Sequence, residues 1–282
     1  MLAQKIITGV IISEADHRPV PYALITETRH RFGTYADAEG RFSAHIPSEA
    51  DTLLIACIGY QTRLIPVADL TGATVWQLRP NPTQLPEVLV RGTKPKLFTT
   101  GAIRKRSPIV WGNCSGRNIE FALHLRNPDH LRGYLHQVRY LVARGGVPTA
   151  PFRVRVYACT EGAPGEDLLP ESVVTAARRG NSWCEIDLSR YGIRFPEEGL
   201  FVAMEWLPTH EARYRFSLSA GPSGPLRVVR ECFGQYLAFS RDLRPASYWE
   251  RINGGIWRRH TPFSRTGQGE HPVIQARIAV TE

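Results

Sequence analysis

Carboxylates that stand inside apolar sequence are the side chains of this chain best placed to do chemistry. Glu205 lies in an apolar run, and Asp187 and Glu185 lie in an alternating segment upstream of it. Arg153 and Arg155 share one face of a third segment. Because a lone buried charge is costly, we expect Glu205, Asp187, Arg153 and Arg155 to form a cross-strand ion-pair ladder on the polar face of a sheet.

The alternative for the same carboxylates is catalysis. Glu205 and Asp187 would then be the acid and base of a glycosidase-like enzyme, which needs its two carboxyl groups roughly 5–9.5 Å apart. A pocket that holds both groups would favour the enzyme, whereas a paired ladder would favour a binding protein. The sequence leaves both readings open.

Other catalytic and metal centres lack their motifs. No His is followed by Glu at the third position and no His-Glu-x-x-His occurs, so neither kind of zinc peptidase is supported. No Gly-x-Ser-x-Gly elbow and no phosphate-binding glycine loop is present. His136, His210 and His271 have no regular spacing, which favours packing or surface roles. We therefore expect no catalytic residue, no metal and no cofactor.

Aromatic and arginine side chains gather near the C-terminus. Exposed aromatic rings stack on sugars, and Arg and Asn supply directed hydrogen bonds, so this cluster is the expected ligand site. The alternative is that its two tryptophans cap a sandwich core. The expected ligand-binding residues are Trp249, Trp257, Tyr248, Arg251, Arg258 and Arg259, with Tyr236 and Asn253 nearby.

The first ninety residues read as short strands separated by turn residues, and these strands would position any functional side chain there. Gly40 ends a tight turn in which a glycine can take positive φ, and Thr52–Ile58 is an apolar run typical of a buried strand. Regular strand spacing predicts a small β-sandwich. The expected strands are Lys5–Ile12, Tyr22–Thr28, Gly33–Tyr35, Arg41–Ile46, Thr52–Ile58, Arg63–Val67, Thr74–Leu78 and Glu87–Val90.

The order of these motifs resembles the carboxypeptidase-regulatory-like domain, a transthyretin-like β-sandwich. The matching pieces are Pro19 to Ala23, Gly33 to Phe42 and Gly59-Tyr60, while Ala36 and Pro21 depart from the usual pattern. The resemblance covers about a third of the chain. It implies an accessory module of secreted or outer-membrane proteins, TonB-dependent receptors among them, and it implies no peptidase activity.

The rest of the chain also alternates as strands do. Phe152–Cys159 places Phe152, Val154, Val156 and Ala158 on one face and Arg153, Arg155, Tyr157 and Cys159 on the other. One short helix is expected at Pro170–Ala176. The pattern predicts a jelly-roll-like β-sandwich and resembles uncharacterised jelly-roll regions of cell-envelope proteins. The other expected strands are Ile119–Leu125, Leu135–Val142, Trp183–Leu188, Leu200–Leu207, Tyr214–Ala220, Tyr236–Ser240, Gly255–Arg259 and Val273–Val280.

The whole chain is therefore expected to be all-β. Residues 1–92 form the carboxypeptidase-regulatory-like sandwich, residues 93–98 form a linker, and residues 99–282 form the jelly-roll-like sandwich. The sequence contains no stretch of about 18 apolar residues, so no membrane-spanning helix is expected.

The net charge and the cysteine spacing limit which kinds of partner and which disulfides can be expected. The net charge is +9; residues 1–92 carry a net −1 and residues 93–282 carry +10. The excess is mostly Arg, yet no nucleic-acid-binding signature accompanies it, so nucleic acid is an unlikely partner. The five cysteines contain no Cys-x-x-Cys pair, and their disulfide state is open.

Met1-Leu2-Ala3-Gln4 resembles the end of a secretory signal peptide. A periplasmic, outer-membrane-associated or secreted location is expected on that basis, with the cytoplasm as the alternative if Met1 is the true start. We expect a non-enzymatic cell-envelope accessory protein whose second sandwich binds a glycan or a protein. A glycoside-hydrolase-like enzyme and a purely structural module are the alternatives.

Overall fold

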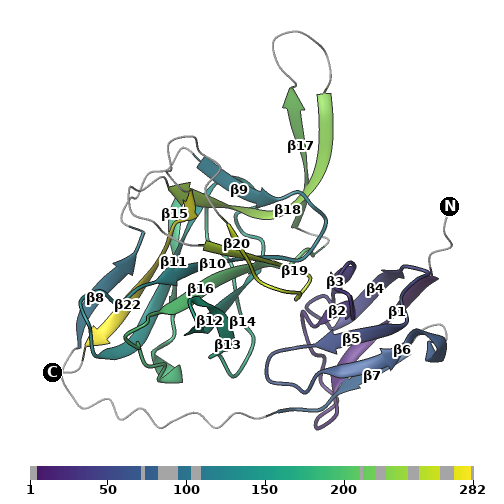
Figure 1. Ribbon diagram of the computed structural model, residues 1–282. Helices are drawn as coiled ribbons and strands as arrows, with labels where there is room; N and C mark the ends of the chain where they lie inside the picture. Colours follow the sequence, from purple (N-terminus) through teal and green to yellow (C-terminus); the bar gives the residue numbers. More distant parts are fainter. Residues whose placement is uncertain are drawn as a thin grey trace.

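The computed structural model describes residues 5–70, 74–81, 95–102, 109–209, 212–219, 227–240, 248–260 and 270–280. It is all-β, with two sandwiches that lie beside one another (Figure 1). The described residues contain no helix that is long and apolar enough to cross a membrane. The expected strand Glu87–Val90, the leader-like Met1–Gln4 and His210 lie outside the described residues.

The N-terminal sandwich consists of a three-stranded and a four-stranded sheet, ordered β4-β1-β7 and β3-β2-β5-β6. β1 pairs antiparallel with β4 and parallel with β7. Alternating side chains of both sheets, such as Ile7, Ile25 and Ile55, meet in one buried core. Its strands are β1 (Lys5–Ser13), β2 (Leu24–Glu27), β3 (Gly33–Tyr35), β4 (Arg41–Ile46), β5 (Thr52–Ala56), β6 (Arg63–Pro66) and β7 (Thr74–Leu78).

The second sandwich is larger and consists of a seven-stranded and an eight-stranded sheet. The first runs β13-β12-β16-β10-β19-β20 with β14 beside β12, and the second runs β17-β18-β11-β22-β8 with β15, β9 and β21 at its sides. The strands of the first sheet are β10 (Ile119–Leu125), β12 (Phe152–Thr160), β13 (Ala163–Asp167), β14 (Val173–Thr175), β16 (Leu200–Trp206), β19 (Tyr248–Ile252) and β20 (Arg258–His260). Those of the second are β8 (Lys96–Gly101), β9 (Ile109–Asn113), β11 (Gly133–Gly146), β15 (Ser182–Asp187), β17 (Arg213–Ser219), β18 (Arg227–Ser240), β21 (His271–Pro272) and β22 (Ile274–Val280).

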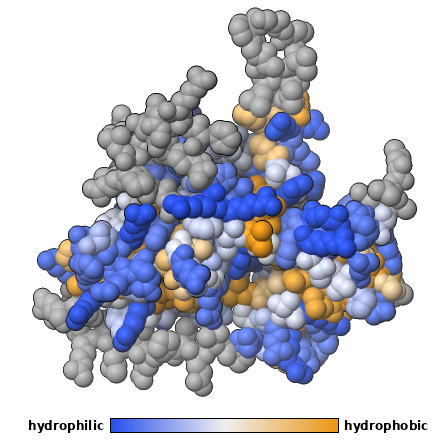
Figure 2. Space-filling view, in the orientation of Figure 1, coloured by the Kyte–Doolittle hydropathy of each residue, from blue (hydrophilic) through white to orange (hydrophobic). Residues whose placement is uncertain are grey.

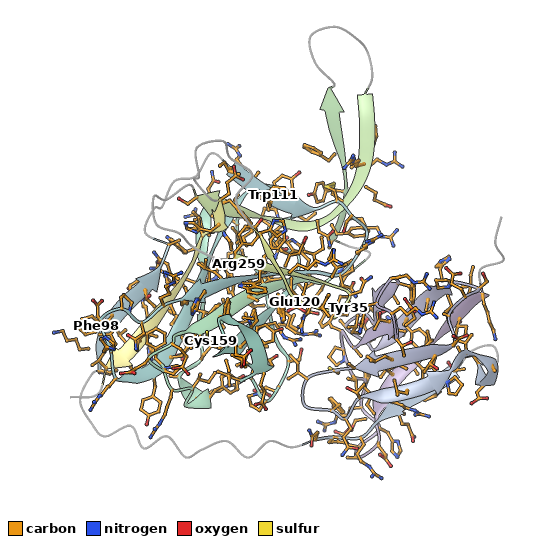
Figure 3. The ribbon with its side chains drawn as sticks, in the orientation of Figure 1. Tyr35, Phe98, Trp111, Glu120, Cys159 and Arg259 are labelled. Carbon is orange, nitrogen blue, oxygen red and sulfur yellow. A yellow bond between two sulfur atoms is a disulfide. The ribbon has the colours of Figure 1, made fainter. Side chains whose placement is uncertain are left out.

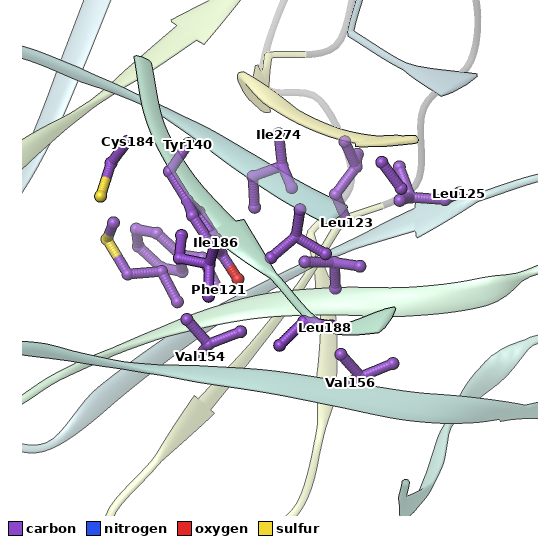
Figure 4. Close-up of a cluster of buried hydrophobic side chains, with 14 of the residues drawn as sticks. Phe121, Leu123, Leu125, Tyr140, Val154, Val156, Cys184, Ile186, Leu188 and Ile274 are labelled. Atoms are coloured by element: carbon purple, nitrogen blue, oxygen red, sulfur yellow. The ribbon is translucent and has the colours of Figure 1, made fainter. Parts of the chain in front are cut away.

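The core of the second sandwich lies between these two sheets. Phe152, Val154 and Val156 of β12 point into it, as their alternation predicts. Figure 4 shows Val154 and Val156 in one cluster with Tyr140 and Ile274 of the facing sheet. The opposite face of β12 carries Arg153, Arg155 and Tyr157, which are buried or nearly so. The outer face of the seven-stranded sheet is therefore covered along β12 rather than solvated.

The structure differs from two expectations about local conformation. The short helix expected at Pro170–Ala176 is wrong, because Val173–Thr175 pairs with β12 as strand β14. Residues 93 and 94 of the expected linker lie outside the described residues, and Lys96 already begins β8.

A disulfide joins Cys114, after β9, to Cys232 in the middle of β18. The two residues are 118 positions apart in the sequence, and no spacing motif marks them. Cys57, Cys159 and Cys184 are free thiols. The bond fixes the turn after β9 to the long β17–β18 hairpin, which projects from the sandwich (Figure 1).

The double variant Cys114→Ala/Cys232→Ala is expected to lower the free energy of unfolding by about 2–5 kcal/mol, because a cross-link over so long a loop restricts the unfolded chain. Urea titration of both proteins measures this change. Cys184→Ala is the control for loss of a thiol. An unchanged denaturation midpoint in the double variant would contradict the bond's role.

Candidate functional site at the joint of the two sandwiches

A row of charged side chains crosses the outer face of the seven-stranded sheet. In register, Arg153 of β12 pairs with Glu205 of β16, Glu205 with Glu120 of β10, and Glu120 with Arg251 of β19. Strands place alternate residues on one face, so all four side chains stand together. Two glutamates at the centre are thus flanked by an arginine on each side.

Each glutamate of this row is bonded to more than one partner. Arg153 Nη1 donates to both oxygens of Glu205 at 3.1 Å, and Arg155 Nη1 lies 3.1 Å from Glu205 Oε2. Arg251 donates to Glu120 Oε1 through Nε at 2.9 Å and Nη2 at 2.7 Å.

Two more side chains complete the network. Tyr157 Oη donates to Glu120 Oε2 at 2.7 Å, because β12 carries the tyrosine on the same face as its arginines. Arg155 Nε and Asp167 Oδ2 form a close ion pair at 2.8 Å without hydrogen-bond geometry. We call Arg153, Arg155, Arg251, Glu120, Glu205 and Asp167 the charge cluster. Its positive and negative charges balance.

Small residues make room for this cluster. Ala203 and Ala122 occupy the next row of the sheet, between Arg155 on β12 and Trp249 on β19, and neither is exposed. Trp249 and Trp257 pack over this second row. The Arg251 guanidinium lies 4.5 Å from the Trp257 ring centroid, an arrangement that favours a cation over an aromatic face.

Tyr35 of the N-terminal sandwich covers the charge cluster on the side that faces this sandwich. Its hydroxyl donates to Glu205 Oε1, and the Arg153 guanidinium lies 5.7 Å from its ring centroid. Arg153 Nη2 also donates to the backbone carbonyl of Tyr22. Figure 3 shows Tyr35 at the edge of its sandwich, beside Glu120. The buried charges of one sandwich therefore hold the other in place.

A second contact holds the joint at the end of β2. His30 Nδ1 lies 2.9 Å from the Asn253 carbonyl, and Asn253 Nδ2 donates to the His30 carbonyl at 3.0 Å. Both residues have positive φ, so a turn from each sandwich meets the other. Asn253 Oδ1 in turn accepts the Asn118 backbone N–H at 3.1 Å.

Burial and charge together set the protonation of this site. Burial alone would raise the pKa of Glu205, but Arg153, Arg155 and the Tyr35 hydroxyl lower it to about 2. Burial raises the pKa of Asp167 against the opposing effect of Arg155. The pKa of Tyr35 and of Tyr157 is raised well above the ordinary value, chiefly by burial. Burial also raises the pKa of the Cys57 thiol, which disfavours the reactive thiolate.

An open cleft of about 570 Å³ lies next to this contact, between the two sandwiches. We call it the joint cleft. Its walls come from β3 and β4 of the first sandwich and from the turn after β9 and the start of β17 in the second. It is lined by Arg31, Phe32, Gly33, Thr34, Ser43, His45, Pro47, Ser115, Gly116, Arg117, Arg213 and Asn253.

The structure brings three residues of the expected ladder together and leaves one out. Arg153, Arg155 and Glu205 form ion pairs, although on a covered face rather than on a polar one. Asp187 lies in the opposite sheet and accepts hydrogen bonds from Ser189 N at 2.8 Å and its hydroxyl at 2.6 Å. Glu205 and Asp187 thus do not form a pair.

The aromatic–arginine cluster divides in the same way. Tyr248 is buried in the main core and stacks on His260. Trp249, Trp257 and Arg251 are half-buried over the seven-stranded sheet. Arg258 and Arg259 are exposed on β20.

Glu185, the third carboxylate considered from the sequence, pairs with Arg139 at 2.8 Å in the eight-stranded sheet.

Sequence reasoning missed Glu120, Asp167, Tyr35 and the arginines of the joint cleft. Glu120 carried a signal, because it is a lone carboxylate in the apolar strand Ile119–Leu125. The others had none, since their partners are distant in the sequence.

Residues 7–90 match the CarboxypepD_reg-like domain family. The resemblance expected from the motifs is thereby confirmed, and this module is non-catalytic. No curated protein matches the chain. A solved structure of the infectious bursal disease virus Gt strain matches 100% of this chain at 7% identity with a TM-score of 0.23, too low to support any inference. The chain spans 57% of the length of that viral chain.

Arg153→Met is expected to lower the free energy of unfolding by about 3–5 kcal/mol, because it removes the arginine that bonds both oxygens of the buried Glu205 and leaves the charge cluster with one uncompensated negative charge. The matched control is Arg41→Met, which breaks an exposed pair with Asp37 and is expected to change stability little. Urea denaturation of the full chain measures both. Equal losses in the two variants would contradict a buried, mutually dependent cluster.

Glu205 is expected to make stability fall in acid. A folded pKa of about 2, below the ordinary 4.5, stabilises the folded state above pH 4.5, and this contribution is lost as the pH falls toward 2. Denaturation midpoints of wild type and Glu205→Gln over this range measure it. The difference between the two denaturation midpoints should shrink as the pH falls. The midpoint of the control Glu39→Gln, on an exposed turn, should follow that of the wild type at every pH. A constant difference would refute the assignment.

Proposed function

We propose, from the premise that residues 7–90 form a CarboxypepD_reg-like domain, that this chain is a non-enzymatic accessory protein of the cell envelope. It binds a glycan or a protein partner, and its two sandwiches act as one binding body. The observation that carries the proposal is the joint cleft, which both sandwiches line and which the adjoining buried contacts hold together.

The state of the carboxylates supports binding over hydrolysis. Glu205 and Glu120 are neighbours on one face, but each is neutralised by arginine and buried. A general acid needs a raised pKa, whereas that of Glu205 is lowered. The joint cleft has no carboxylate among its described lining residues. An acid–base pair open to substrate is therefore not formed by these residues.

The disulfide supports an extracytoplasmic location. Stable disulfides form in oxidising compartments and are rare in the cytosol. Cys114–Cys232 joins the turn after β9 to β18 within the second sandwich, so it belongs to the fold and not to a reactive surface pair. Such a bond agrees with the periplasm, the outer membrane or the extracellular space.

A glycan array and an affinity pull-down from envelope extract, both with the full chain, test the proposal. At least one glycan or envelope protein is expected to bind. Loss of binding in His30→Ala/Tyr35→Phe, which loosens the joint, is expected as well, while Arg41→Gln on the first sandwich keeps it. Thermal melting verifies that both variants fold.

Two results would count against the proposal in different ways. If no glycan and no protein is retained, binding fails as a function, and the structural-module alternative gains. If a ligand binds equally well to the loosened variant, binding stands but the two sandwiches do not share the site.

A further inference from the structure

We propose that the joint cleft binds a carboxylated oligosaccharide, such as one rich in uronic acid. This inference rests on the proposed function and names its ligand class. A volume of about 570 Å³ lies within the range of pockets that hold small ligands. The second sandwich supplies two arginines to this cleft and the first supplies one, and both sandwiches supply hydroxyls.

Positive charge in the cleft comes from three separate segments. Arg31 follows β2, Arg117 precedes β10, and Arg213 begins β17; all three are exposed. The Arg117 side chain has no carboxylate partner among the described residues. Guanidinium groups match carboxylates through paired N–H donors, so an anionic ligand is favoured.

The other two arginines are only loosely paired. Arg31 lies 3.5 Å from Glu27 and 3.9 Å from Glu49, and Arg213 lies 3.7 Å from Glu231. The Arg31–Glu49 and Arg213–Glu231 pairs are exposed, and such pairs contribute little to stability. Glu27 is buried, but it keeps the backbone N–H bonds of Arg29 and Arg31 when the Arg31 side chain turns away. A ligand carboxylate can therefore replace these side-chain pairs.

Neutral groups between the arginines favour a sugar over a peptide. Thr34, Ser43 and Ser115 offer hydroxyls and His45 offers a ring nitrogen, whereas Phe32 and Pro47 are the apolar side chains among the described lining residues. Sugars present many hydroxyls and few apolar groups, so this lining suits them. Figure 2 shows hydrophilic side chains over the part of the first sandwich that carries β3 and β4.

A buried amide lies behind the cleft wall. Asn118 is 2% exposed, and neither its Oδ1 nor its Nδ2 has a hydrogen-bond partner. Its Nδ2 lies 3.0 Å from where a Cβ on Gly33 would stand, and Gly33 lines the cleft. A buried amide without partners is costly. Asn118 therefore lies behind the part of the cleft wall that Gly33 and Asn253 form and is not itself a lining residue.

The loop that carries Arg117 is held in shape before any ligand binds. Asn113 Oδ1 accepts from Ser115 N at 3.2 Å and from Ser115 Oγ at 2.9 Å, and Arg117 N donates to Ser115 Oγ at 3.1 Å. The Cys114 disulfide anchors the same turn. Preorganisation reduces the ordering cost of binding.

Isothermal titration of the full chain with a galacturonic acid tetrasaccharide tests this inference, with a galactose tetrasaccharide and a tetraglutamate peptide as comparison ligands. The acidic sugar is expected to bind, more weakly as salt increases, and the two comparison ligands are not. Arg117→Gln should weaken binding by about tenfold or more. Arg259→Gln, an exposed arginine outside the cleft, should leave it unchanged.

Three results would overturn the inference. Binding of the peptide at least as tight as that of the sugar would assign the cleft to an acidic protein partner. Loss of sugar binding on Arg259→Gln but not on Arg117→Gln would place the ligand on β20. No binding of any of the three probes would reject the ligand class, and the proposed function would then stand or fall on the array and pull-down alone.

Discussion

Burial of charge beneath Tyr35 is the constraint on which the arrangement of this molecule depends. Glu205 and Arg153 are almost fully removed from solvent, and such groups are tolerated only where each is paired and hydrogen-bonded. The seven-stranded sheet meets this demand with a register that sets Arg153, Glu205, Glu120 and Arg251 side by side. The position of the first sandwich follows, because its tyrosine completes the shell of Glu205.

The joint cleft is a consequence of that position rather than a feature of either sandwich. Its lining residues come from the segment between β2 and the end of β4 on one side, and from the turns after β9 and β19 and the start of β17 on the other. Gly33 is central because any side chain there would meet Asn253 Oδ1 at 2.7 Å. A glycine at this site lets the two backbones approach closely enough to share a wall.

Local patterns predicted most strands but not what their outer faces touch. The alternation in Phe152–Cys159 correctly separated the core-facing residues from the arginines, since that periodicity is a property of the strand itself. The expected polar face proved covered, because Tyr35 lies 170 positions from Glu205 and nothing local announces the contact. Likewise, the apolar run around Glu205 and the alternating segment around Asp187 do not reveal that the two residues lie in different sheets, which only the sheet topology decides. The helix expected at Pro170–Ala176 failed for a related reason, since pairing with β12 decided the conformation of that segment.

The charge balance of the cluster also bears on how the molecule is assembled. All six charged members belong to the second sandwich, and the first contributes only a neutral hydroxyl and a backbone carbonyl. The cluster is therefore electrically neutral without the N-terminal module. An exchange of that module would remove the hydrogen bonds to Glu205 and Arg153 but would take no counter-charge away from the cluster.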